Sequence, residues 1–315
     1  MQGTVRIPAA KNSVLPLIAA SLLCTKPVRL RGVPRLSDVE ACLALVRSTG
    51  EKAGWQGSDV CVSGTPFCST LPGQTAEQMR ASILFCAPLL ARLGRAETSL
   101  PGGCKIGARP VDLHLAGLAK MGAQEHPAGP GRLLLTAPSG LHGAEITLSF
   151  PSVGATETLL LAAACAKGQT VLRGAAREPE IGDLAAFLNR CGGCVEGAGT
   201  STIRIEGRRT LGGCVFSPLP DRIFASTLAC ACAAAGGRVE LAGCPASLYA
   251  PVLEILAQMG CAVDTDGDTV RLARFGRLYG AGRVFTGVYP GLATDAAPLL
   301  AAAMLCAGGE SSIEE

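Results

Sequence analysis

A repeat of about 70 residues constrains this sequence more than any other feature. Short strand patterns that follow Ala/Leu-rich helix patterns are centred on Leu30, Leu100, Leu172, Leu241 and Ile313, which lie 70, 72, 69 and 72 positions apart. After four of these strands comes a turn with glycine, and then a second helix with apolar residues at helical spacing. A steady period of this kind indicates a repeated supersecondary unit that buries its core against its neighbours.

Each unit has the predicted order strand, helix, strand, helix and strand pair, a βαβαββ pattern of the α/β class. The first strands are expected at residues 4–7, 145–148, 214–216 and 283–285. Three units then form a first domain at residues 9–213, and residues 1–8 with 214–315 form a second. The last unit stops partway through its second strand or the following turn. A unit cut there cannot bury its faces, so we expect a C-terminally truncated chain with an incomplete second domain.

Polar residues recur between the first strand and the first helix of each unit. They lead with Lys11, Arg80, Ser152, Asp221 and Asp295, at spacings of 69, 72, 69 and 74. Free N–H groups at helix N-termini attract anions, so these slots predict an anion-binding site at one end of the layer. Ser152 and Asp221 are also ordinary N-caps, and for these two alone capping is the favoured interpretation. Lys11 and Arg80 are not capping residues, and an anionic ligand explains them better.

A glycine-rich turn at residues 101–114 is the most reactive-looking segment. It reads Pro-Gly-Gly-Cys-Lys-Ile-Gly-Ala-Arg-Pro-Val-Asp-Leu-His and runs from a short strand into an apolar helix pattern. Cys104 stands beside Lys105 and Arg109, close to the predicted helix start. Cations and a helix N-terminus stabilise a thiolate, so Cys104 is a candidate for chemistry. The plainer alternative is a small residue in a turn.

Composition excludes several classes of protein. The formal net charge is +3 and the basic residues are scattered, so nucleic acid is not an expected partner. Fifteen cysteines, an odd number in a long chain without a signal peptide, argue against a disulfide framework. Cys191 and Cys194 have CxxC spacing, but no second pair or histidine completes a metal site. The apolar runs are too short to span a bilayer, which makes the cytoplasm the expected location.

Several motifs together carry a family resemblance over nearly the whole chain. The chain resembles the enolpyruvyl transferases, and within them the enzymes that act on UDP-N-acetylglucosamine at the start of peptidoglycan synthesis. The Gly-Gly-Cys to Leu-His stretch is the most specific of these motifs. The others are Ala10-Lys-Asn, Met79-Arg-Ala-Ser, Pro151-Ser-Val-Gly-Ala-Thr, Ala176-Arg-Glu-Pro-Glu-Ile, Leu219-Pro-Asp-Arg-Ile and Thr294-Asp.

The resemblance implies the enolpyruvyl transferase fold, a two-domain inside-out α/β barrel that closes on its substrates. It implies transfer of the enolpyruvyl group of phosphoenolpyruvate to the 3-hydroxyl of UDP-N-acetylglucosamine, with release of phosphate and without a metal or organic cofactor. Lys11 and Asn12 are then phosphoenolpyruvate contacts, and Lys11 is also a catalytic residue. Cys104 is the proton donor of a mobile loop, and Asp295 orients or deprotonates the sugar hydroxyl. The implied nucleotide-sugar contacts are Arg80, Arg109, Pro110, Val111, Asp112 and Leu113, with Ser152, Val153 and Gly154 as part of the nucleotide cradle.

The sequence departs from the family pattern in three places. Ala9 stands where glycine is usual, and Phe150 replaces a lysine found in some members. The family's last unit, which supplies arginines that hold phosphoenolpyruvate, is absent from these 315 residues. Two alternatives therefore stay open: a non-catalytic nucleotide-sugar-binding paralogue or inactive fragment, and, less favoured, a 3-phosphoshikimate 1-carboxyvinyltransferase.

Overall fold

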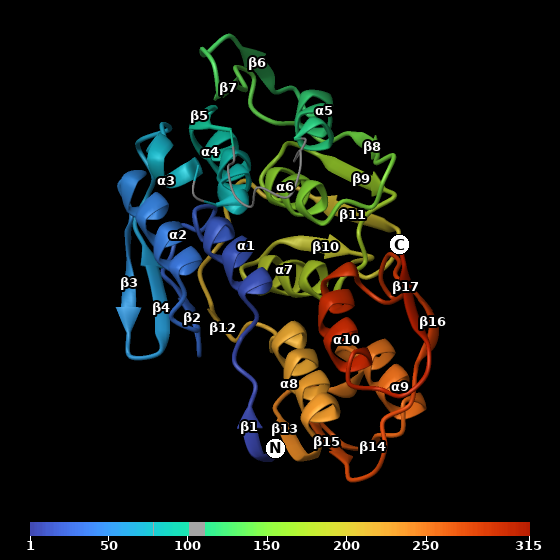
Figure 1. The fold of residues 1–315 in the computed structure, drawn as a ribbon. Coiled ribbons are helices and arrows are strands. Elements are labelled where there is room, and N and C mark those ends of the chain that lie inside the picture. The colour runs from blue at the N-terminus through green and yellow to red at the C-terminus, as the bar shows by residue number, and fades with distance from the viewer. Residues whose placement is uncertain (78, 101–110) are drawn as a thin grey trace. The chain divides into compact units, whose positions relative to one another are not determined.

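The computed structural model describes residues 1–77, 79–100 and 111–315, which form two compact units (Figure 1). The large unit is Lys11–Leu219, and the small unit combines Met1–Ala10 with Pro220–Glu315. The predicted division after residue 213 falls slightly earlier than the division after Leu219. The cause is the strand at 214–216, which pairs within the large unit.

Three repeats build the large unit. The first contains α1 (Lys11–Ser21), β2 (Val28–Leu30), α2 (Ser37–Ser48), β3 (Lys52–Gln56) and β4 (Asp59–Ser63). The second contains α3 (Gly73–Glu77), η1 (Arg80–Phe85), α4 (Cys86–Leu93), β5 (Arg95–Ser99), α5 (Asp112–Lys120), β6 (Gln124–His126) and β7 (Arg132–Thr136). The third contains β8 (Glu145–Thr147), α6 (Val153–Ala163), β9 (Gln169–Arg173), α7 (Pro179–Arg190), β10 (Cys194–Glu196) and β11 (Thr202–Glu206), and β12 (Val215–Phe216) follows it.

The first helix of each repeat forms the core of the large unit (Figure 1). Residues 13–21 of α1 and 155–163 of α6 are buried without exception. A helix that is apolar nearly all round must be covered on all sides. Accordingly, α6 contacts η1, α4, α5 and α7. The N-termini of these core helices carry the polar residues that the repeat pattern singled out.

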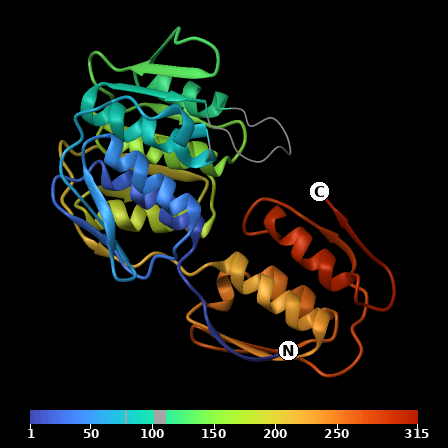
Figure 2. The same cartoon turned by 60° about the vertical axis from the view of Figure 1, so that its left-hand side comes forward.

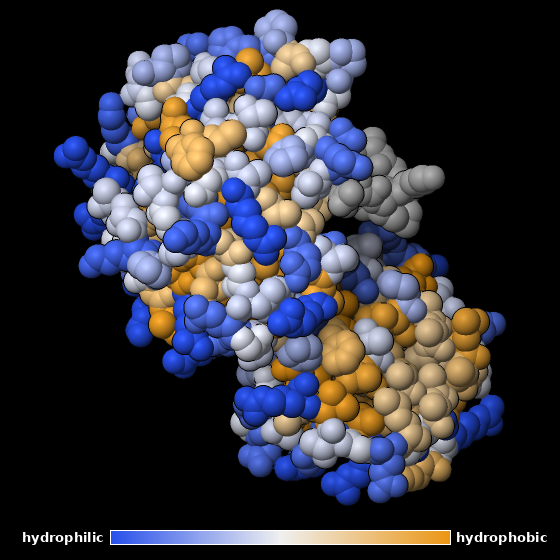
Figure 3. Space-filling view, turned by 90° about the vertical axis from the view of Figure 1, so that its left-hand side faces the viewer, coloured by the Kyte–Doolittle hydropathy of each residue, from blue (hydrophilic) through white to orange (hydrophobic). Residues whose placement is uncertain are grey.

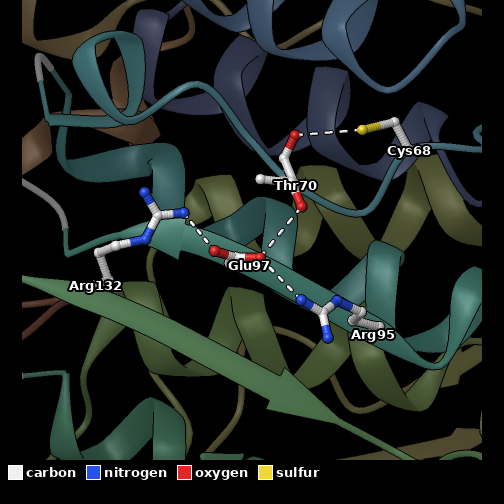
Figure 4. A network of polar contacts seen from close by, with 5 residues as sticks. All are labelled: Cys68, Thr70, Arg95, Glu97 and Arg132. Atoms are coloured by element: carbon white, nitrogen blue, oxygen red, sulfur yellow. Dashed lines mark hydrogen bonds and ion pairs between the residues drawn. The ribbon is translucent and has the colours of Figure 1, made fainter. Parts of the chain in front are cut away.

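In its described residues the second repeat has no first strand of its own. In its place Thr70 forms an isolated parallel bridge with Glu97 on β5. The carboxylate of Glu97 accepts hydrogen bonds from Arg132, from Arg95 at 2.9 Å and from the Thr70 hydroxyl at 3.3 Å (Figure 4). These bonds, that of Arg132 foremost, hold the pKa of Glu97 below its ordinary value. Because the network lies at the surface, we assign it the structural role of fixing this edge.

The small unit contains one complete repeat and part of another. Its elements are β1 (Gln2–Arg6), α8 (Arg222–Ala235), β13 (Gly237–Ala242), η2 (Ala246–Leu248), α9 (Ala250–Gln258), β14 (Ala262–Asp266), β15 (Thr269–Arg274), β16 (Gly282–Phe285), η3 (Thr294–Ala296), α10 (Ala297–Met304) and β17 (Ser311–Glu314). The sheets have the strand orders β1-β13-β15-β14 and β16-β17.

The two units exchange their leading strands. Strand β1 pairs in parallel with β13 of the fourth repeat, and β12 pairs in parallel with β2 of the first. Residues 1–8 were predicted to cross into the second domain, and β1 lies in the small unit. Strand β12 lies in the large unit because Val215 and Phe216 are in register with Arg29 and Leu30.

The helices of the small unit leave apolar surface open. Helices α8 and α10 lie side by side (Figure 2), yet only Leu300 and Ala303 of α10 are buried. Phe224 on α8 is 39% exposed, and Leu305 after α10 is 88% exposed. Apolar residues gather on the small unit in the space-filling view (lower body, Figure 3). Its first helices are thus less covered than α1 and α6 of the large unit.

Candidate functional site

Lys11 and Asn12 are the first two residues of α1. The Lys11 ammonium group lies 3.0 Å from the Asp38 carboxylate, with 45% of the Lys11 side chain exposed. Asn12 is exposed. Asp38 therefore neutralises a cation that would otherwise sit unfavourably at a helix N-terminus.

At two of the recurring polar positions, Ser152 and Asp221, the side chain is an N-cap, as the sequence predicted. The Ser152 hydroxyl accepts a hydrogen bond from the Ala155 N–H at 3.3 Å. The Asp221 carboxylate accepts from the N–H groups of Ile223 and Phe224 at 3.0 and 2.9 Å. Both side chains are thus engaged in starting their helices. Ligand binding by Ser152, Val153 and Gly154 stays a prediction.

His114 and Gly154 form the junction between α5 and α6. His114 is 4% exposed, and its Nδ1 lies 2.8 Å from the Thr158 hydroxyl. A Cβ on Gly154 would lie 3.1 Å from His114 Cε1, so glycine permits this close approach. Burial, and then the Arg80 guanidinium, lower the pKa of His114 to about 4. His114 is therefore neutral at pH 7 and is suited to hydrogen bonding rather than to holding charge.

Arg80 lies in the field of a buried acid that the sequence analysis did not single out. Glu157, on α6, is only 7% exposed. Burial, and then Glu180 and Glu178, raise its pKa to about 8, while Arg80 opposes the rise. The structure thus brings Arg80, His114 and Glu157 into one electrostatic group near the start of α6. The sequence held one sign of a special role for Glu157, which lies within the apolar pattern of α6. A carboxylate inside an apolar helix is costly unless it is neutral or partnered.

Glu157 should make the large unit less stable as the pH rises. A raised pKa in the folded state means that folded protein binds the proton more tightly than unfolded protein does. The resulting contribution of Glu157 to the free energy of unfolding is complete below the ordinary pKa of 4.5 and is lost as the pH rises to about 8. The loss is up to about 1.4 kcal/mol per pH unit. We expect Glu157→Gln to flatten the fall in Tm between pH 5 and 8, measured by thermal unfolding.

Exposed Glu125 provides the matched control. Glu125→Gln makes the same chemical change without a buried carboxyl group, so its Tm should follow the wild-type curve at every pH. A Glu157→Gln curve that stays parallel to wild type from pH 5 to 8 would contradict the assignment.

A second buried acid, Asp183 on α7, links two distant segments. Its side chain is 6% exposed. Its Oδ2 accepts hydrogen bonds from the Ser13 hydroxyl and, at 3.0 Å, from the Leu219 N–H. Burial raises the pKa of Asp183 and these two donors lower it, with burial dominant. The amphipathic pattern of α7 gave no sign of this contact, because its partners lie far away in the sequence.

Asp295 lies in the small unit and lines a pocket there. It stands in η3, immediately before α10, and is exposed. The pocket is bounded by the start of α8, by η2 and α9, and by the segment leading to η3. Its polar lining residues include Arg222, Ser226, Tyr249 and Tyr289. Asp295 is thus an exposed carboxylate among the residues that line a mainly apolar pocket.

Most of the predicted reactive turn lies outside the described residues. This part includes Cys104, Lys105, Arg109 and Pro110. Val111, Asp112 and Leu113 are described at the start of α5, where Asp112 is exposed in the first turn. An anion is favoured at this position of a helix.

One cysteine of the CxxC pair, Cys191, lies beside a third cysteine. The Cys191 sulfur lies 3.3 Å from that of Cys214 rather than engaging Cys194. In residues 1–77, 79–100 and 111–315 no group of three or more His, Cys, Asp or Glu side chains is placed to hold a metal ion. None of the helices in these same ranges is long and apolar enough to cross a membrane.

Curated relatives share one name. A protein from Finegoldia magna named UDP-N-acetylglucosamine 1-carboxyvinyltransferase is 45% identical, covering 100% of this chain and 75% of the relative. Relatives of the same name from Nitratidesulfovibrio vulgaris and Hyphomonas neptunium are 42% and 43% identical with the same coverage. The chain thus spans about three quarters of the length of these proteins.

Solved structures share the fold. The enolpyruvyl transferase NikO from Streptomyces tendae matches with a TM-score of 0.84 at 23% identity, over 99% of this chain and 75% of that one. EPSP synthase from Acinetobacter baumannii matches with a TM-score of 0.73 at 21% identity, over 99% and 73%. The predicted enolpyruvyl transferase fold is therefore confirmed. The family model described as EPSP synthase (3-phosphoshikimate 1-carboxyvinyltransferase) matches residues 1–315. With this match and relatives above 40% identity, the chain belongs to the EPSP synthase family.

Proposed function

We propose that this protein transfers the enolpyruvyl group of phosphoenolpyruvate to the 3-hydroxyl of UDP-N-acetylglucosamine and releases phosphate. The observation that carries the proposal is the common name of curated relatives that are 41–45% identical along the whole chain. The reaction is the first committed step of peptidoglycan synthesis, so the proposal includes a cytoplasmic enzyme that supports cell-wall formation, cell shape and division.

The residue types at the proposed positions suit this chemistry. The sugar hydroxyl attacks C2 of phosphoenolpyruvate and gives up its proton, which Asp295 accepts. The C3 methylene takes up a proton, which Cys104 donates. Loss of a proton from C3 of the adduct and departure of phosphate then restore the double bond. Lys11 and Asn12 bind phosphoenolpyruvate, and fixed cations stabilise the departing phosphate.

The nucleotide sugar is assigned to the start of α5 and α6. Arg80 supplies a positive charge beside His114, and in the described residues its guanidinium forms no ion pair or hydrogen bond. The N–H groups around Val153 and Gly154 and the turn from Arg109 to Leu113 complete the proposed contacts. Exclusion of water would protect the adduct from side reactions.

A phosphate-release assay on the full-length protein tests the proposal. We expect release only when phosphoenolpyruvate and UDP-N-acetylglucosamine are both present. Release with shikimate 3-phosphate instead would identify a 3-phosphoshikimate 1-carboxyvinyltransferase, the activity for which the family model is named. Calorimetric binding of UDP-N-acetylglucosamine without any release would identify a non-catalytic paralogue. Either result would overturn the proposed reaction.

A further inference from the structure

The chain passes between the two units at two points, and both crossings end near one side chain. The first crossing lies between Ala10 and Lys11, and the second between Leu219 and Pro220. Within the small unit the two segments are joined, because the Asp221 N–H donates to the Pro8 carbonyl at 2.8 Å. In the large unit the corresponding link is Asp183. Its Oδ2 accepts from Ser13, two residues after Lys11, and from the N–H of Leu219 itself.

The contact with Ser13 lies in the first turn of α1. Ser13 is fully buried and follows Lys11 and Asn12 directly. Fixing Ser13 therefore fixes the backbone from which these two side chains extend. Asp183 also places a carboxylate beside the N-terminal turn of α1, where the helix dipole favours negative charge. Helix α1 has no acidic residue of its own in that turn.

Burying a carboxylate such as that of Asp183 costs free energy, so it is not an obvious means of stabilising a core. Removing an ionised carboxylate from water costs several kcal/mol, and apolar residues of similar volume often give equal or greater stability. In the described residues Asp183 has no cationic partner. A buried serine also needs no distant acceptor. Ser21, at the other end of the same helix, donates instead to the Ile18 carbonyl of its own helix at 2.6 Å. The Ser13 contact therefore has a purpose beyond satisfying its hydroxyl.

We propose that Asp183 is a positioning residue of the enolpyruvyl transfer reaction. It holds the start of α1 and the end of the large unit together, and so sets the placement of Lys11 and Asn12 against phosphoenolpyruvate. The inference rests on the proposed function for the identity of the substrate. The anchoring contacts themselves do not depend on that function.

Steady-state kinetics of Ser13→Ala test the inference. The variant removes one hydrogen bond to Asp183 and no bulk. Small displacements of substrate-holding groups lower rates steeply, so we expect kcat/KM for phosphoenolpyruvate to fall roughly ten-fold or more. The KM for UDP-N-acetylglucosamine should change less than two-fold or so. Ser21→Ala is the matched control, since it makes the same change at a buried serine of the same helix. Equal kinetic constants in the two variants would overturn the inference.

Hydrogen exchange measured by mass spectrometry provides a readout that needs no activity. In Asp183→Ala, peptides covering residues 11–15 and 217–221 should exchange faster than in wild type, and in Ser13→Ala only the first should do so. If wild type releases no phosphate, the proposed function fails, and the exchange data still decide whether Asp183 anchors both segments. Unchanged exchange at 217–221 in a folded Asp183→Ala variant would refute the anchor.

Discussion

Asp295→Asn is expected to lower kcat by roughly 10²–10⁴-fold, the usual contribution of a general base. The amide keeps the size of the side chain and its ability to accept a hydrogen bond, but it does not take up the hydroxyl proton at neutral pH. Asp295 is exposed in η3, so its replacement should change the free energy of unfolding by no more than about 0.5 kcal/mol, as for most surface substitutions. Phosphate release at saturating concentrations of both substrates measures the effect.

The control is Asp266→Asn on β14 of the same unit. The Asp266 side chain is 79% exposed, and its nearest ion-pair partner, Arg271, is 4.0 Å away. The same chemical change there should leave kcat and both KM values at wild-type levels. If Asp295→Asn retains more than about a tenth of wild-type kcat, Asp295 is not the general base.

Phe187→Ala should destabilise the large unit by about 3–5 kcal/mol. Phe187 on α7 is fully buried, and its ring meets that of Phe216 edge to face with centroids 5.6 Å apart. Truncation leaves a cavity where α7 packs on β12 and removes the aromatic contact. The midpoint of urea unfolding should fall by about 1–2 M for a unit of this size.

Trp55 makes the measurement specific. It is the only tryptophan of the chain and lies on β3 of the large unit, where its indole N–H donates to Glu40 at 2.6 Å. Its fluorescence therefore reports the unfolding of that unit. Phe150→Ala is the control, because Phe150 is 59% exposed in the same unit and leaves no cavity. Similar midpoints for the two variants would show that the Phe187 contact does not support the fold.

The sequence predicted most strands and helices of both units because their signals are local. The strand expected at residues 145–148 is β8 at Glu145–Thr147, and the strand centred on Leu241 is β13 at Gly237–Ala242. Alternating residues, turn glycines and helical spacing each act over a few neighbours. The same local logic identified Ser152 and Asp221 as N-caps, and the hydrogen bonds to their side chains confirm it.

What the sequence did not predict depends on distant partners. The pairing of β12 with β2 joins segments nearly two hundred residues apart, which no local pattern encodes. Glu157 and Asp183 sit on helices where a charge normally indicates the solvent face, yet both are buried. Asp38 is the partner of Lys11, a cation for which the sequence alone suggested only a ligand. The assignments of Cys104 and Arg109 fall outside the described residues and stay predictions.

The exchange of strands also sets an order on folding during synthesis. Strand β1 is translated well before its partner β13, which ends at Ala242. At about 5–20 residues per second, β1 waits on the order of 10–50 s for that partner. During this time Gln2–Arg6 is an unpaired edge strand, able to join other strands. The large unit meets a shorter delay, since its last strand ends at Phe216. Slow translation therefore lengthens the time for which Gln2–Arg6 stays unpaired.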